Sequence, residues 1–121
     1  MCEKELAMNL TYAVDRLYEM GWLPSKGGGT ELDRLDDGRR FPSVQSIVAD
    51  FGLAGLKLVI KPNLMFNCYQ AAWCPLNENL DPAHEPDDRH GTVIGSCERE
   101  AAVYALAQHL STLAEMQLAI A

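Results

Sequence analysis

The sequence predicts an α+β fold in which a three-stranded antiparallel sheet is sandwiched or covered by helices. Residues 56–61 and 67–74 carry apolar side chains at alternating positions, which is the period of a half-buried strand. Residues 90–110 combine a β-rich run, a stop at Gly95 and a strongly amphipathic helix. We therefore expect strands over 56–61, 67–74 and 91–95, and an antiparallel pairing of all three.

Two helices are expected before this sheet. Residues 4–20 carry apolar side chains at helical spacing, and Gly21 ends the helix. Residues 43–51 follow, with Ser43 as the N-cap and Gly52 as the end. The first helix must also bury its apolar side chains, and the face of the sheet opposite to the other helices is one place open to it.

The last helix is expected over residues 97–115. Ser96 is a good N-cap, and Glu98 and Glu100 suit the positive end of the helix dipole. The apolar residues predicted to face the core are Ala102, Val103, Leu106, Leu110 and Leu113. From residue 43 onward the order of elements is therefore α-β-β-β-α.

The length of 121 residues suits a single domain, residues 1–121. Two of its segments are predicted to be loops. Residues 24–41 contain three consecutive glycines and several charges, which is typical of a flexible Gly-rich loop. Residues 76–90 are acidic and contain prolines, and we interpret them as a hairpin loop between the second and third strands.

The chain is acidic, with a formal net charge of −7. Its acids gather in two segments, namely Glu31, Asp33, Asp36 and Asp37, and then Glu78, Asp81, Glu85, Asp87 and Asp88. Its basic residues are scattered, apart from the short pairs Arg39–Arg40 and Lys57–Lys61. The negative electrostatic field of so acidic a chain repels phosphate backbones and anionic lipid. We therefore expect partners that are proteins, and no binding to nucleic acid or to membranes.

The expected cellular location follows from two kinds of segment that the sequence lacks, a membrane helix and a signal peptide. No apolar run approaches the ~20 residues of a membrane helix, and the first residues lack the basic and apolar regions of a signal peptide. We therefore expect a cytoplasmic protein. The cysteines are Cys2, Cys68, Cys74 and Cys97; they form no C-x2-C pair, and we expect free thiols in a reducing compartment.

No catalytic, cofactor-binding or metal-binding residue is predicted, although several stretches were weighed. Gly27-Gly28-Gly29-Thr30 follows a lysine, but that order is wrong for a phosphate-binding loop and no strand leads into it. Imidazoles and carboxylates that suit zinc or manganese gather in the second loop, and we interpret them as solvated side chains. They are His84, Glu85, Asp87, Asp88 and His90.

Four further residues have side chains that could carry chemistry or line a core. Cys97 lies at the expected N-terminus of the last helix, a position that can sharpen the reactivity of a thiol, but most such cysteines are inert. His109 lies at the flank of the helix's apolar stripe, and we interpret it as a residue at the boundary of the core. Trp22 and Trp73 are interpreted as core aromatics.

The order α-β-β-β-α is that of double-stranded-RNA-binding domains. Those domains open their last helix with lysines that grip phosphates, whereas this chain has Glu98 and Glu100 in the same place. RNA binding is therefore not expected.

The chain more closely resembles the small phage and prophage proteins grouped as the phage ABA sandwich domain. The likeness rests on Met20-Gly21-Trp22, on FPSVQSIVADFG at 41–52, on YQAAW at 69–73 and on GTVIGSCEREAAVYALAQ at 91–108. The resemblance implies a fold and an origin in a mobile element, and it offers no activity to carry over.

The expected function is that of a non-enzymatic accessory or protein-interaction protein of phage or prophage origin in a bacterial host. It would bind through the sheet edge, the first helix or an acidic loop. An acidic inhibitor that occupies a host nucleic-acid-binding protein is the first alternative, and a small hydrolase is the second. Self-association as a two-fold homodimer is a further expectation.

Overall fold

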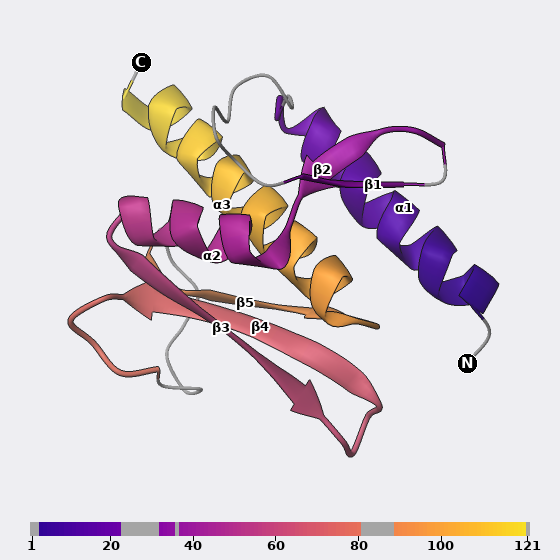
Figure 1. Cartoon of the computed structure of the whole chain (residues 1–121). Coiled ribbons are helices and arrows are strands. Elements are labelled where there is room, and N and C mark those ends of the chain that lie inside the picture. Colours follow the sequence, from indigo (N-terminus) through magenta and orange to yellow (C-terminus); the bar gives the residue numbers. More distant parts are fainter. Residues whose placement is uncertain (1–2, 23–31, 36, 81–88, 121) are drawn as a thin grey trace.

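The computed structural model describes residues 3–22, 32–35, 37–80 and 89–120 (Figure 1). The helices are α1 (Glu3–Glu19), α2 (Val44–Leu53) and α3 (Glu98–Ile120). The strands are β1 (Leu32–Arg34), β2 (Arg40–Pro42), β3 (Leu56–Asn63), β4 (Cys68–Pro75) and β5 (Gly91–Gly95). The predicted fold class is confirmed, because the chain is α+β and β3, β4 and β5 form an antiparallel sheet in that order.

The sheet has one covered face and one open face. Ile60, Ala71 and Val93 lie in one row across the three strands, and Leu58 and Trp73 lie in the next row on the same face. Figure 1 shows α1, α2 and α3 on one side of the sheet. The described residues therefore form two layers, with the helices over the face that carries Trp73.

The helix α1 packs against α3, so the opposite face of the sheet is not its place. The reason lies in the composition of α3, whose buried apolar residues are Ala101, Ala102, Val103, Ala105, Leu106 and Ala107. Since most of these side chains are alanines, α3 is thin enough to be approached by the sheet, α2 and α1 together. The apolar stripe of α1 is thereby buried, with Ala13, Val14 and Leu17 inside the core.

Aromatic rings form the centre of the core between α2 and the sheet. Phe51 is fully buried, and its ring centroid lies 5.5 Å from that of Trp73. Trp73 is thus a core aromatic as predicted, whereas Trp22 is only partly buried and packs against the core from outside. The prediction that Leu113 faces the core is wrong, because its side chain is 40% exposed. Figure 1 shows the reason, since the C-terminal end of α3 extends beyond the sheet and the other helices.

Part of the predicted loop 24–41 is a β-hairpin, which corrects that prediction for its described residues. β1 and β2 pair antiparallel, and Gly38 makes the turn with a φ of 92°. The hairpin is anchored by Phe41, which is buried, and by the Tyr18 hydroxyl, which donates to the carbonyl of Arg40 at 2.6 Å. Each strand has three residues, too few to display an alternating pattern in the sequence.

Charged side chains also hold this hairpin. The Arg39 guanidinium bonds to Asp15 of α1 and to Asp37 of the turn. The backbone N–H of Arg39 donates to Asp37 at 2.9 Å and lowers the pKa of that carboxyl. Asp37, one of the described acids of this segment, is therefore paired with a base.

The helix ends are partly as predicted. Ser43 caps α2, since its Oγ accepts from the backbone N–H of Ser46 at 3.2 Å. The helix runs past Gly52 to Leu53, and the chain turns at Gly55 with a φ of 81°. At the start of α3 the prediction of Ser96 as the cap is wrong.

The residue that caps α3 is Cys97. Its carbonyl accepts from the N–H of Ala101 at 3.0 Å, and its Sγ accepts from the N–H of Glu100 at 3.5 Å. Ser96 instead donates its hydroxyl to the Glu100 carboxylate. The sequence rule favoured an oxygen cap over sulfur, and this hydrogen bond gives Ser96 another role.

Candidate functional site

The described part of the chain contains no group of three or more His, Cys, Asp or Glu side chains that could hold a metal ion. Of the loop set, His84, Glu85, Asp87 and Asp88 lie outside the described residues, as does the stretch 27–30. His90 is described, and its Nε2 lies 3.1 Å from Oε1 of Glu78. This contact joins the two ends of the acidic loop.

The described cysteines are free thiols with structural surroundings. Cys74 is buried in β4, and its Sγ donates to the carbonyl of Glu78 at 3.7 Å. Cys68 is half-buried in the same strand. Cys97 uses its sulfur as the cap of α3. A packing or capping role therefore accounts for Cys74 and Cys97.

His109 lies in the core, and its interpretation as a boundary residue is wrong. Its ring centroid lies 4.9 Å from that of Phe51, because α2 crosses α3 at this turn. Its Nδ1 is buried and has no hydrogen-bond partner among the described residues. Burial lowers the pKa of His109, so the imidazole is neutral at pH 7.

Acid should destabilise the protein through His109. The unfolded chain takes up this proton near the ordinary pKa of 6.5, whereas the folded chain resists it. The free energy of unfolding should therefore fall as the pH drops below 6.5, and His109→Leu should remove this part of the fall. Chemical denaturation at about pH 7.5 and about pH 5.5 measures it. An equal loss in both proteins would show that His109 is not the group responsible.

The two edges of the three-stranded sheet differ in chemistry. β3 carries Lys57, Lys61 and Pro62, and lysine and proline are residues that protect an edge from pairing with another chain. β5 carries neither a charge nor a proline, and its Ile94 is 64% exposed. Among the described strands β5 pairs only with β4. Within the part of the chain that the structure describes, the outer edge of β5 is therefore unprotected.

Two glycines seat β5 closely against the body of the protein. A Cβ at Gly95 would lie 2.5 Å from the backbone nitrogen of Ala101, in the first turn of α3. A Cβ at Gly91 would lie 2.2 Å from the ring of Trp73. Both positions require a residue without a side chain. The strand that carries the unprotected edge therefore packs closely against α3 and against Trp73.

A groove of about 580 Å³ runs beside β5, between α1 and α3. Its lining residues are Tyr12, Asp15, Arg16 and Glu19 of α1, Val93 and Ile94 of β5, and Tyr104, Ala107 and Gln108 of α3. Its charges are largely paired, since Asp15 bonds to Arg39 and Arg16 lies 3.5 Å from Glu19. Burial, assisted by Glu100, raises the pKa of Tyr104, so that this phenol is neutral.

The groove joins two surfaces that the sequence suggested separately, the sheet edge and the first helix. The helix contributes a second stripe, beside its buried one, and its residues are Tyr12, Asp15, Arg16 and Glu19. Their spacing of three and four residues was the available signal. The tyrosines of the groove, Tyr12 and Tyr104, were missed because nothing in the sequence places α1 against α3.

Comparisons of the chain with protein-family models, with curated proteins and with solved structures found no match. The resemblance to the phage ABA sandwich domain therefore stays a prediction. Within the described ranges, no helix has both the length and the apolar character that crossing a bilayer requires.

Proposed function

We propose that this protein is a non-enzymatic protein-interaction module of phage or prophage origin, which binds an extended segment of a partner protein along β5. The observation that carries the proposal is the unprotected edge of β5 beside a groove. An added strand gains main-chain hydrogen bonds from such an edge, and a neighbouring groove selects its side chains. The module acts in the cytoplasm of the bacterial host.

The dimensions define the segment that the site accepts. β5 has five residues, so the added strand pairs over about 16 Å. Alternate side chains of that strand point toward the groove, where Val93 and Ala107 offer apolar contacts and Tyr104 and Gln108 offer polar groups. The partner segment is therefore extended, with an apolar residue at every second position.

The surroundings of the reactive side chains support a non-enzymatic role. Cys97 caps a helix, His109 stacks in the core and His90 contacts Glu78. The alternative of an acidic inhibitor has less support, because Asp37 bonds to Arg39 and Asp33 lies 3.8 Å from Arg99. A regular array of unpaired carboxylates is what imitation of a nucleic acid needs.

Ile94→Lys tests the proposal, because it gives β5 the kind of residue that protects β3. We expect the tagged wild-type protein to capture a partner from a bacterial lysate, and Ile94→Lys to recover about tenfold less. Leu113→Lys is the matched control, since it places the same charge at an exposed position of α3, and it should capture normally. Equal recovery by the wild type and Ile94→Lys would refute binding along β5.

A further inference from the structure

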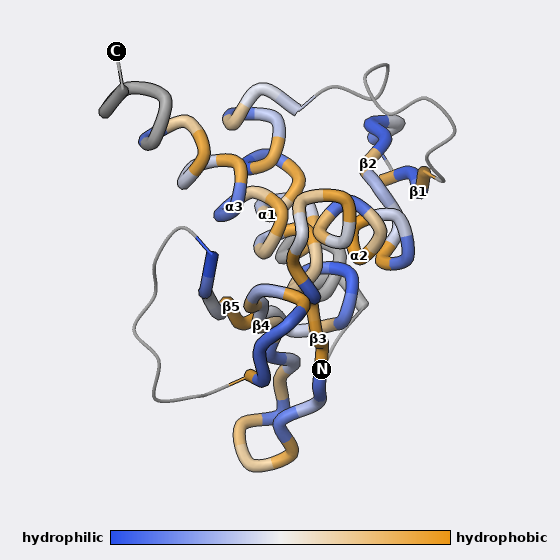
Figure 2. The backbone as a smooth tube through the Cα atoms, turned by 90° about the vertical axis from the view of Figure 1, so that its left-hand side faces the viewer, coloured by the Kyte–Doolittle hydropathy of each residue, from blue (hydrophilic) through white to orange (hydrophobic). Residues whose placement is uncertain are grey.

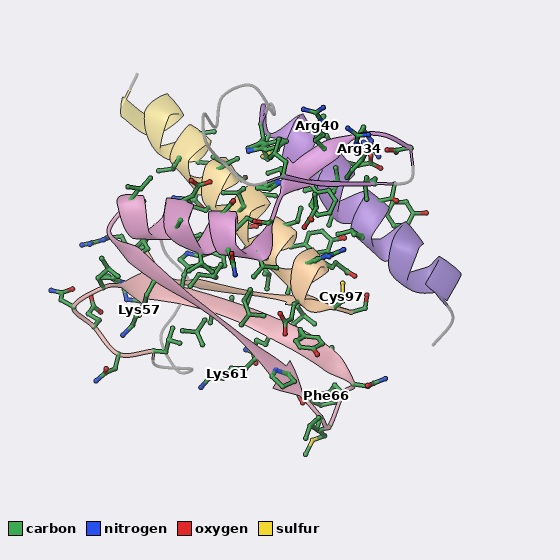
Figure 3. All side chains as sticks on the ribbon, viewed as in Figure 1. Arg34, Arg40, Lys57, Lys61, Phe66 and Cys97 are labelled. Atoms are coloured by element: carbon green, nitrogen blue, oxygen red, sulfur yellow. The ribbon has the colours of Figure 1, made fainter. Side chains whose placement is uncertain are left out.

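The turn between β3 and β4 exposes three consecutive large apolar side chains, which we call the hairpin tip. Leu64 is 90% exposed, Met65 85% and Phe66 72%. Figure 2 shows this turn at the lower end of the molecule, away from the helices, and Figure 3 labels Phe66 at the same turn. No other described segment exposes three such residues in a row. Contiguous exposed apolar surface marks an interaction site.

The hairpin tip has an ordered backbone. The side-chain Oδ1 of Asn63 accepts from the N–H of Met65 at 3.1 Å and from the N–H of Phe66 at 3.3 Å. Asn67 closes the turn in the left-handed region, with a φ of 51° that asparagine tolerates. Since these bonds fix the turn before any partner arrives, contact with the hairpin tip loses little backbone entropy.

The hairpin also differs in charge from the rest of the protein. Residues 51–77 contain two lysines and no acid, so this segment carries +2 while the rest of the chain carries −9. The segment covers α2's last residues, β3, the hairpin tip and β4. A strongly acidic protein thus has one continuous segment without carboxylates, which we call the acid-free segment.

Two of the three strands that form the open face of the sheet, β3 and β4, belong to this acid-free segment. Strand alternation places the following residues on it: Lys57, Val59, Lys61, Asn63, Cys68, Gln70, Ala72, Cys74, Thr92 and Ile94. The Gln70 amide donates to the Thr92 hydroxyl at 3.1 Å and ties β4 to β5 across this face. The face is therefore ordered and adjoins the hairpin tip, with the lysines along one side (Figure 3).

We propose that the hairpin tip and the open face of the sheet form the contact between two copies of this chain. Each copy carries a net charge of −7, so two copies repel one another over most of their surfaces. Contact through the acid-free segment sets no acid of residues 51–77 against another, because this segment contains none. In a two-fold dimer both copies use this same surface, and each hairpin tip packs on the sheet of its partner.

The surface available agrees with such a dimer. A stable interface needs roughly 800 Å² from each copy. Leu64, Met65 and Phe66 supply a large apolar share of it, and the open face of the sheet supplies the remainder. A lipid bilayer is the less favoured occupant. Two lysines attract an anionic surface weakly, and the rest of the chain, at −9, is repelled by it.

Phe66→Asp tests the proposal by analytical ultracentrifugation of the full chain. We expect the wild type to pass from monomer to dimer over the micromolar range, and Phe66→Asp to raise the dissociation constant about 30-fold or more. Leu113→Asp places the same charge on an exposed leucine of the helix layer and should leave the dimer intact. Circular dichroism should show all three proteins folded, since neither substituted side chain is buried.

A wild-type protein that stays monomeric at every concentration, or a Phe66→Asp variant that dimerises normally, would overturn the proposal. Sedimentation with phosphatidylcholine–phosphatidylglycerol vesicles is the second arm. Binding of a monomeric wild type to them would assign the hairpin tip to lipid instead. The proposed function is tested separately, because Phe66→Asp should still capture a partner along β5.

Discussion

Leu106→Ala is expected to lower the free energy of unfolding by about 2–5 kcal/mol. Leu106 is 4% exposed and lies on α3, where its buried neighbours along the helix are mostly alanines. Their short side chains leave a cavity that relaxation fills poorly. Chemical denaturation measures the change. Leu113→Ala is the control, and its 40% exposure predicts a loss of about 1 kcal/mol or less. Equal midpoints for the two variants would mean that the buried face of α3 is wrongly assigned.

Gly95→Ala is expected to lower the free energy of unfolding by about 1–3 kcal/mol. The added methyl carbon would lie 2.5 Å from the nitrogen of Ala101 and 2.9 Å from its Cα. Since both are backbone atoms, β5 must move away from α3 to admit it.

Gly52→Ala is the matched control for this substitution. A Cβ at Gly52 meets no atom within 4 Å, and the residue lies inside α2. Alanine is the better helix former, so Gly52→Ala should stabilise the protein by about 0.5–1 kcal/mol. Thermal or chemical denaturation compares the two, and a harmless Gly95→Ala would contradict the close seating of β5.

The sequence predicted the sheet well because its signals are local. Alternation over 56–61 and 67–74 gave β3 and β4 to within two residues, and Gly95 ended β5 as expected. The hairpin of β1 and β2 was not predicted, because it depends on Phe41 packing into a core that distant elements build. The burial of His109 was not predicted for the same reason, since the Phe51 ring that packs against it belongs to another helix.

The interaction surface could be predicted only in pieces. Alternation says that a segment is a strand, but not which strand ends at the edge, and the long connection before β5 allows more than one order. The lysines of β3 and the uncharged sequence of β5 indicate a protected and an unprotected edge only once both strands are known to lie at the edges of the sheet. The place of α1 beside β5 depends on the alanines of α3, because their small side chains let α1 pack against that helix.

Amide hydrogen exchange, compared between the free protein and its complex with the captured partner, tests the central claim most directly. If an extended segment adds to β5, the amides of residues 91–95 should exchange more slowly in the complex, together with those of α1 along the groove, while β3 should be unchanged. Slower exchange confined to β3 or to residues 64–66, with β5 unchanged, would contradict it.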